Sequence, residues 1–198
     1  MVLFRGDIKC KSLQRRTSLS VILPADNIHY LQGTEEIAEK PYKTLYLLHG
    51  LFGSDDIFLA NTTIQKFAED HNIAVVLPSG ENSFYVDQKE SHKYYGEFIG
   101  RELVEMTRNI FPLSHKKEDT YLAGFSMGGY GAYRLALGTE HFSYAASLSG
   151  VLTFDGMEEN FKENPAYWGG IFGNWETFKG SDNEILSLAE RKQEDKPK

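Results

Sequence analysis

Four short and almost wholly apolar runs are spaced along the chain, and segments with helical periodicity lie between them. The runs are residues 44–48 (TLYLL), 74–77 (AVVL), 120–123 (TYLA) and 143–148 (SYAASL). Runs of this kind are typical of strands that are covered on both faces, as in parallel sheets. Because strands that alternate with helices form right-handed βαβ units, we expect an α/β fold, with a mostly parallel sheet and helices on both faces.

Other segments complete this expected organisation. The predicted helices are residues 61–71, with Ile64, Phe67 and Ala68 on one face; residues 96–111, with apolar side chains at intervals of three and four up to Ile110; and residues 130–137, which Gly138 ends. Residues 17–23 predict an additional strand, and residues 25–42 predict a surface loop. A single domain is expected over residues 1–198. Within it, residues 152–190 are interpreted as a lid-like excursion beyond the sheet, with a late helix near 183–191.

Charge and cysteine content narrow the classes of partner and compartment. The formal net charge is −7, which argues against nucleic-acid binding, because that needs a basic face, and against docking on an anionic membrane. No run approaches the ~18–20 apolar residues of a membrane span. Cys10 is the single cysteine, so neither an internal disulfide nor a cysteine-based zinc site is expected. We interpret it as a partly buried small side chain, with a reactive thiol as the alternative. These features predict a cytoplasmic protein.

Residues 124–128 (GFSMG) match the pattern G-x-S-x-G and follow the apolar run at 120–123 directly. A helix is predicted to begin there, so the setting is the strand–turn–helix that a nucleophile elbow requires. Such a sharp turn strains the backbone of its central residue, and small neighbours let the strand and the helix approach each other. Ser126 is therefore the predicted catalytic nucleophile. The alternative is a glycine-rich helix start with a capping serine.

A second candidate segment, residues 47–53 (LLHGLFG), ends the first apolar run. Where a nucleophile elbow is present, one N–H of the oxyanion hole comes from the residue after the nucleophile, here Met127. The other comes from an early strand-to-helix loop, which makes Leu51 the expected second donor. His49 is interpreted as a support of this loop and not as the catalytic base, because the base follows the serine in this arrangement.

These segments resemble the esterase D branch of the α/β-hydrolase superfamily, which includes S-formylglutathione hydrolases, tributyrin-type carboxylesterases and some feruloyl or acetyl esterases. The matching segments run in order over residues 44–150: YLLHGLFGSDD, VVLPSGENSFYVD, GEFIGRELVEMTRNIFP, YLAGFSMGGYGAYRLAL and FSYAASLSG. The resemblance implies a serine carboxylesterase that cleaves short-chain acyl esters or thioesters through an acyl-enzyme on Ser126. It implies Leu51 and Met127 as oxyanion donors, no cofactor or metal, and association into a homo-oligomer.

The base and the acid of such an enzyme are not evident in the sequence. After Ser126 the single histidine is His141, and the intervening helix carries it some 15 Å from the serine. Asp155 follows the run at 143–148, whereas in most members of this branch the acid follows the next strand. We therefore expect the last strands, with the acid and the base, to lie beyond Lys198. The alternative to an esterase is then a non-catalytic or inactive α/β-hydrolase fragment that binds an ester without turnover.

Two further expectations follow from this interpretation. A sheet without its last strands exposes an edge and an apolar face, which favours self-association. In the excursion, Trp168, Trp175 and Phe172 are candidates for a cover over an acyl pocket. Equally, these aromatic side chains could simply pack the excursion onto the sheet.

Overall fold

The computed structural model describes residues 1–26 and 40–194, and a sheet in the order β1-β2-β4-β3-β7-β8 forms the centre of this part of the chain. Its strands are β1 (Val2–Cys10), β2 (Arg15–Leu23), β3 (Lys43–Leu48), β4 (Ile73–Pro78), β7 (Thr120–Phe125) and β8 (Tyr144–Leu148). The four apolar runs of the sequence are β3, β4, β7 and β8, and they pair in parallel. Only the hairpin β1–β2 joins the sheet antiparallel, so the expected mostly parallel sheet is confirmed.

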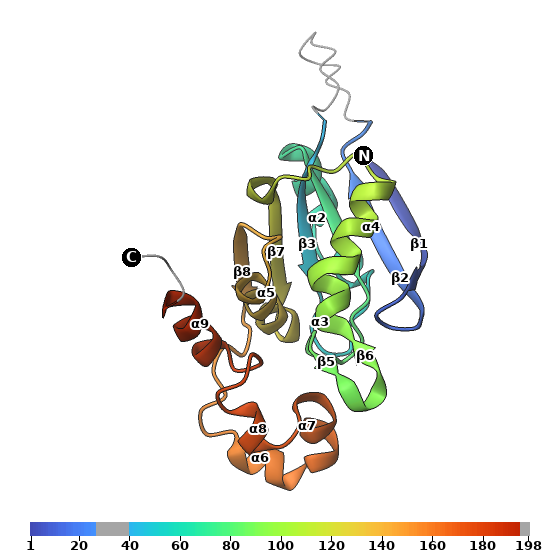
Figure 1. The fold of residues 1–198 in the computed structure, drawn as a ribbon. Helices are drawn as coiled ribbons and strands as arrows, with labels where there is room; N and C mark the ends of the chain where they lie inside the picture. The colour runs from blue at the N-terminus through green and yellow to red at the C-terminus, as the bar shows by residue number, and fades with distance from the viewer. Residues whose placement is uncertain (27–39, 195–198) are drawn as a thin grey trace.

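Helices cover both faces of the sheet, as expected (Figure 1). On one face lie α1 (Ile57–Asn61) and α2 (Ile64–Asp70). The other carries α3 (Tyr95–Glu97), which continues through a π-helical turn, η2 (Phe98–Glu102), into α4 (Leu103–Ile110), and α5 (Met127–Gly138). The buried side chains form two clusters, one on each side of the sheet. Short elements complete this part: β5 (Asp87–Gln88), η1 (Lys89–Ser91), β6 (Lys93–Tyr94) and η3 (Lys117–Asp119).

The segment after β8 extends beyond the edge of the sheet at which the parallel strands end (Figure 1). It contains α6 (Glu158–Glu163), α7 (Pro165–Phe172), α8 (Trp175–Phe178) and α9 (Ile185–Glu194). Phe172 and Phe178 are buried in an aromatic cluster, and Phe172 contacts Phe84 and Tyr130 with ring centroids 5.2 and 5.8 Å apart. These contacts support the view that the aromatic side chains pack the excursion onto the rest of the molecule.

The structure corrects three details of the sequence analysis. Strand β1 has no counterpart there, because its mixed side chains carry no buried run and its pairing with β2 is what orders it. Phe67 is 54% exposed, since α2 has only two turns and buries Ala68 alone. Ile110 is 56% exposed because it is the last residue of α4 and no further helical turn follows to cover it. Most of the predicted loop at 25–42 lies outside the described residues.

The parallel order of β3, β4, β7 and β8 brings the loops that follow these strands to one edge of the sheet. Residues 49–56 follow β3, residues 79–86 follow β4, and the GFSMG segment spans the end of β7. The predicted nucleophile and the predicted oxyanion donors are thus placed at the same edge. Within the described part of the chain, no helix has both the length and the apolar character needed to cross a membrane.

Candidate active site

Ser126 occupies a strained turn between β7 and α5. Its φ of 53° and ψ of −116° are rarely adopted by a residue with a side chain. The backbone around it is held on both sides: its N–H donates to the Leu148 carbonyl oxygen at 2.8 Å, and its own carbonyl oxygen accepts from Gly129 and Tyr130. The geometry is the strand–turn–helix expected from the sequence, with the serine at the point where the chain reverses.

Two glycines allow this turn to form. A Cβ atom on Gly124 would lie 2.2 Å from the carbonyl oxygen of Gly128, and a Cβ atom on Gly128 would lie 2.2 Å from the carbonyl oxygen of Leu48. Both clashes are with backbone, which cannot move aside without displacing α5 from β7 or β3. Glycine at these positions therefore lets the start of α5 approach the sheet closely.

The loop after β3 lies against Ser126. A Cβ atom on Gly50 would be 3.3 Å from the Cβ atom of Ser126, so Leu51 follows at a point of direct contact with the elbow. The N–H groups of Leu51 and of Met127 donate to no acceptor in the described ranges 1–26 and 40–194. The Met127 N–H is also the first of α5, where the helix dipole favours negative charge.

His49 orients the peptide that carries the Leu51 N–H. Its ring is 1% exposed, with Nδ1 at 2.7 Å from the Gly50 carbonyl oxygen and Nε2 accepting from the Gly80 N–H at 2.8 Å. Since a carbonyl oxygen only accepts, Nδ1 carries the proton and the ring is neutral. The Gly50–Leu51 peptide is planar, so fixing its carbonyl oxygen also fixes the Leu51 N–H in the opposite direction. His49 thus supports the loop, as the sequence indicated.

Burial also sets the charge state of His49. Desolvation lowers the pKa of the imidazole below its ordinary value, and the hydrogen bond to the Gly50 carbonyl and the charge of Asp55 oppose this only in part. Asp55 secures the same loop to β2, because its two carboxylate oxygens accept from Ser18 and Ser20, each at 2.6 Å. These two hydrogen bonds join Asp55 to residues more than 30 positions away in the sequence. No local sequence pattern predicted them.

An apolar cleft of about 910 Å³ opens beside the elbow. Leu51, which carries one of the two predicted oxyanion N–H groups, and Phe125, which directly precedes Ser126, both line it. Its remaining walls come from the loop after β3, from α1 and from the end of β8: Gly50, Phe52, Gly53, Ile57, Phe58, Asn61, Thr62, Ser147, Leu148 and Ser149. Its volume lies in the range of small-molecule sites.

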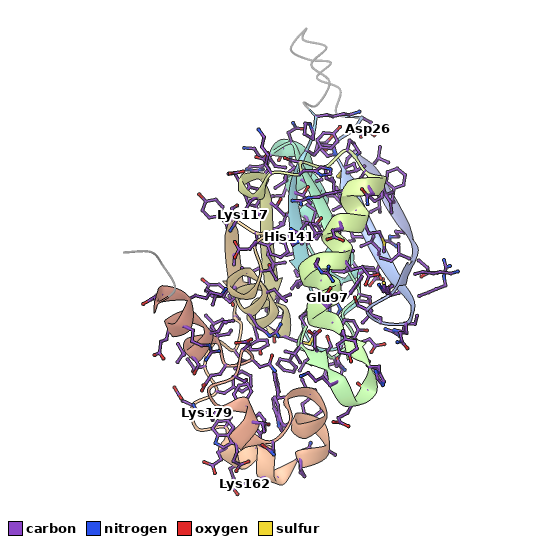
Figure 2. All side chains as sticks on the ribbon, viewed as in Figure 1. Asp26, Glu97, Lys117, His141, Lys162 and Lys179 are labelled. Atoms are coloured by element: carbon purple, nitrogen blue, oxygen red, sulfur yellow. The ribbon has the colours of Figure 1, made fainter. Side chains whose placement is uncertain are left out.

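No described histidine or carboxylate is hydrogen-bonded to the Ser126 hydroxyl. The Oγ atom of Ser126 has no hydrogen-bond partner in the described part of the chain. His141 lies at the other end of α5, about 18 Å along the helix. It lies beside α4, where burial and the charge of Arg108 lower its pKa (Figure 2).

Residues 1–26 and 40–194 contain no group of three or more His, Cys, Asp or Glu side chains placed to hold a metal ion.

Cys10 is remote from this site. The thiol is buried, and its desolvation together with the Glu102 carboxylate raises the pKa to about 12. It therefore stays protonated, and a reactive thiolate is not formed at neutral pH. The structure favours the interpretation of Cys10 as a small packing residue.

A family model described as "Putative esterase" matches residues 10–196. The chain belongs to this esterase family. By family it is a carboxylic ester hydrolase of α/β-hydrolase fold, as the resemblance to the esterase D branch implied. An acetyl esterase of Caldicellulosiruptor saccharolyticus is 36% identical to it over 203 residues, which are 99% of this chain and 76% of that protein.

Solved esterase-family structures agree with this assignment. A fluorophosphonate-binding serine hydrolase of Staphylococcus aureus, FphF, superposes with a TM-score of 0.80 at 31% identity, covering 98% of this chain and 75% of that one. The S-formylglutathione hydrolase FrmB of the same organism gives a TM-score of 0.79 at 32% identity, with the same coverage. These proteins share the α/β-hydrolase fold with the chain.

Proposed function

We propose that this esterase is a serine carboxylesterase that acts on short-chain acyl esters or thioesters, with Ser126 as the nucleophile. The observation that carries the proposal is the strained backbone of Ser126 beside the N–H groups of Leu51 and Met127, which donate to no acceptor in the described part of the chain. Its acetyl esterase relative supports an ester substrate, and its likeness to an S-formylglutathione hydrolase supports a thioester.

The proposed reaction passes through an acyl-enzyme. The Oγ atom of Ser126 attacks the carbonyl carbon, and the oxyanion that forms accepts hydrogen bonds from Leu51 and Met127. The serine proton passes to a general base and then to the leaving alcohol or thiol, whose bond to the acyl carbon breaks. Water then attacks the acyl-enzyme, releases the carboxylic acid and restores the serine hydroxyl.

A second candidate function is ester binding without turnover. It is favoured by one observation: in the described part of the chain, neither a histidine nor a carboxylate is hydrogen-bonded to Ser126, and His141 lies at the far end of α5. A site with an oxyanion hole and a nucleophile but no base retains only a small residue of catalysis. The two candidates therefore differ in the reactivity of Ser126, not in the shape of the site.

Reaction with an alkyl fluorophosphonate separates these candidates. We expect intact mass to show a single adduct and peptide mapping to place it on Ser126. Ser126→Ala should remove the adduct and lower turnover of p-nitrophenyl acetate by at least about 10³-fold. Ser149→Ala is the matched control, because Ser149 lines the same cleft and also has a positive φ; this variant should still be labelled. No adduct and no turnover in the unaltered chain would leave ester binding as the function.

A further inference from the structure

Phe52 adopts a backbone conformation that a phenylalanine rarely takes. The Gly53 N–H donates to the Gly50 carbonyl oxygen at 3.2 Å, which closes a turn with Leu51 and Phe52 at its centre. The φ of Phe52 is 62°, while Leu51 is not among the residues with positive φ, so the turn has the form of type II. That position normally holds glycine, because a Cβ atom there is strained. Something outside the turn must therefore hold Phe52 in place.

Asn82 supplies that hold. Its Oδ1 atom accepts a hydrogen bond from the Phe52 N–H at 2.9 Å. Reversal of the Leu51–Phe52 peptide would relieve the positive φ, but it would also turn this N–H away from Asn82. The hydrogen bond consequently favours the strained form of the turn over the relaxed one.

The loop that presents Asn82 is itself held in one conformation. Ser83 donates through Oγ to the Gly80 carbonyl oxygen at 2.6 Å and accepts the Tyr85 N–H at 3.0 Å. The fully buried Tyr85 in turn donates its hydroxyl to the His49 carbonyl oxygen at 2.9 Å. Asn82 is thus a fixed acceptor, placed by the same contacts that place the oxyanion loop.

Burial does not offset this strain in the described part of the chain, because Phe52 is 91% exposed. Phe52 is instead one of the residues that line the apolar cleft, together with Ile57, Phe58 and Leu148. Leu51 and Phe125 also line this cleft, and Phe125 directly precedes Ser126, so an ester whose carbonyl group lies at Ser126 has this wall nearby. An exposed aromatic ring held at such a place is suited to contact with a ligand.

We infer that Phe52 is a specificity-determining residue that binds an apolar chain of the ester, and that Asn82 is its positioning residue. The inference rests on the proposed ester site at Ser126 and adds the substrate class: esters in which one side carries a chain longer than acetyl or methyl. Neither residue takes part in bond breaking. Asn82 acts only through the turn that it holds.

Binding to the Ser126→Ala protein tests this without any need for turnover. Methyl hexanoate, hexyl acetate and methyl acetate would be titrated while the amide resonances of Leu51, Phe52 and Phe125 are followed by NMR. We expect the preferred long ester to bind at least about ten-fold more tightly than methyl acetate, because each added methylene buries apolar surface. Adding Phe52→Gly should reduce this preference to about three-fold or less. Phe67→Ala, which removes an exposed phenylalanine from α2, should leave it unchanged.

Asn82→Ala tests the positioning role. It should accelerate hydrogen exchange at the Phe52 N–H by about ten-fold and weaken the chain-length preference, whereas Asn82→Ala added to Phe52→Gly should change that preference no further. A preference that survives Phe52→Gly overturns the specificity role, and an unprotected Phe52 N–H in the unaltered chain overturns the role of Asn82. Failure of the proposed function is read separately, as absence of a fluorophosphonate adduct on Ser126.

Discussion

His49 links the geometry of one peptide to the stability of the chain. The ring is buried, neutral and hydrogen-bonded through both nitrogens, so its protonated form would set an Nε2–H against the Gly80 N–H. Burial lowers the pKa of His49 in the folded state, while the unfolded chain keeps the ordinary value near 6.5. Below that pH the unfolded state binds more protons than the folded state, so stability should fall as the pH falls.

This effect should be visible in urea unfolding between pH 7.5 and pH 5. We expect the His49 contribution to the free energy of unfolding to be lost below about pH 6.5, at no more than about 1.4 kcal/mol per pH unit. His49→Gln cannot titrate, so its free energy of unfolding should depend less steeply on pH, while the other titrating groups act equally in both proteins. Parallel pH profiles for the two proteins would contradict a neutral, buried His49.

At the scale of elements, the two edges of the sheet in the described part of the chain differ in chemistry. The edge strand β1 carries charged side chains at Arg5, Asp7 and Lys9, which discourage pairing with another sheet. The other edge strand, β8, reads YAASL and has no charge. Tyr144 is 71% exposed and Leu148 is 52% exposed. We propose that self-association of the chain, where it occurs, uses β8 and not β1.

A single lysine on β8 tests this proposal. Ala146→Lys places a charge on the exposed face of the edge strand and should lower the association constant by about ten-fold or more in sedimentation velocity. Ala166→Lys makes the same change on the exposed surface of α7 and should leave association unchanged. Equal association of both variants would exclude β8 as the contact.

The elements differ in how far the sequence could predict them. Strands β3, β4 and β7 are largely buried, and buried strands form apolar runs, which is why these three were predicted. The run of β8 was also predicted as a strand, but the expected cover on both faces is wrong for it in the described part of the chain, where every second residue of β8 is exposed. Strand β1 was not predicted, because its charged and apolar side chains form no apolar run and the strand is paired only with β2 in the described part of the chain. The elbow at Ser126 was predictable from spacing. The role of Asn82 was not predictable, because its hydrogen bond with the Phe52 N–H joins two loops 30 residues apart in the sequence. No local sequence pattern indicates such a contact.

At the scale of the whole molecule, the excursion after β8 is attached to the sheet chiefly through α5. Tyr130 donates its hydroxyl to the Asn183 carbonyl oxygen at 2.6 Å, and Arg134 donates through Nε to the Asn183 side chain at 2.8 Å. The Tyr130 ring also contacts Phe154, with centroids 5.7 Å apart. We propose that residues 1–198 form one domain in which residues 152–190 open as a lid-like segment, with Asn183 as the main polar attachment.

Loss of one hydroxyl can distinguish a segment that opens from one that unfolds only with the sheet. Tyr130→Phe removes the hydrogen bond to Asn183 and keeps the ring, so hydrogen exchange should become about five- to ten-fold faster in α6–α8 and stay unchanged in β3 and α4. Tyr46→Phe is the matched control, because it removes a buried hydrogen bond to Thr107 at 2.7 Å on the α4 side. In the Tyr46→Phe variant, hydrogen exchange in α6–α8 should not become faster than exchange in the sheet. If Tyr130→Phe accelerates exchange equally in α6–α8 and in β3, the excursion opens only by global unfolding and is not a lid.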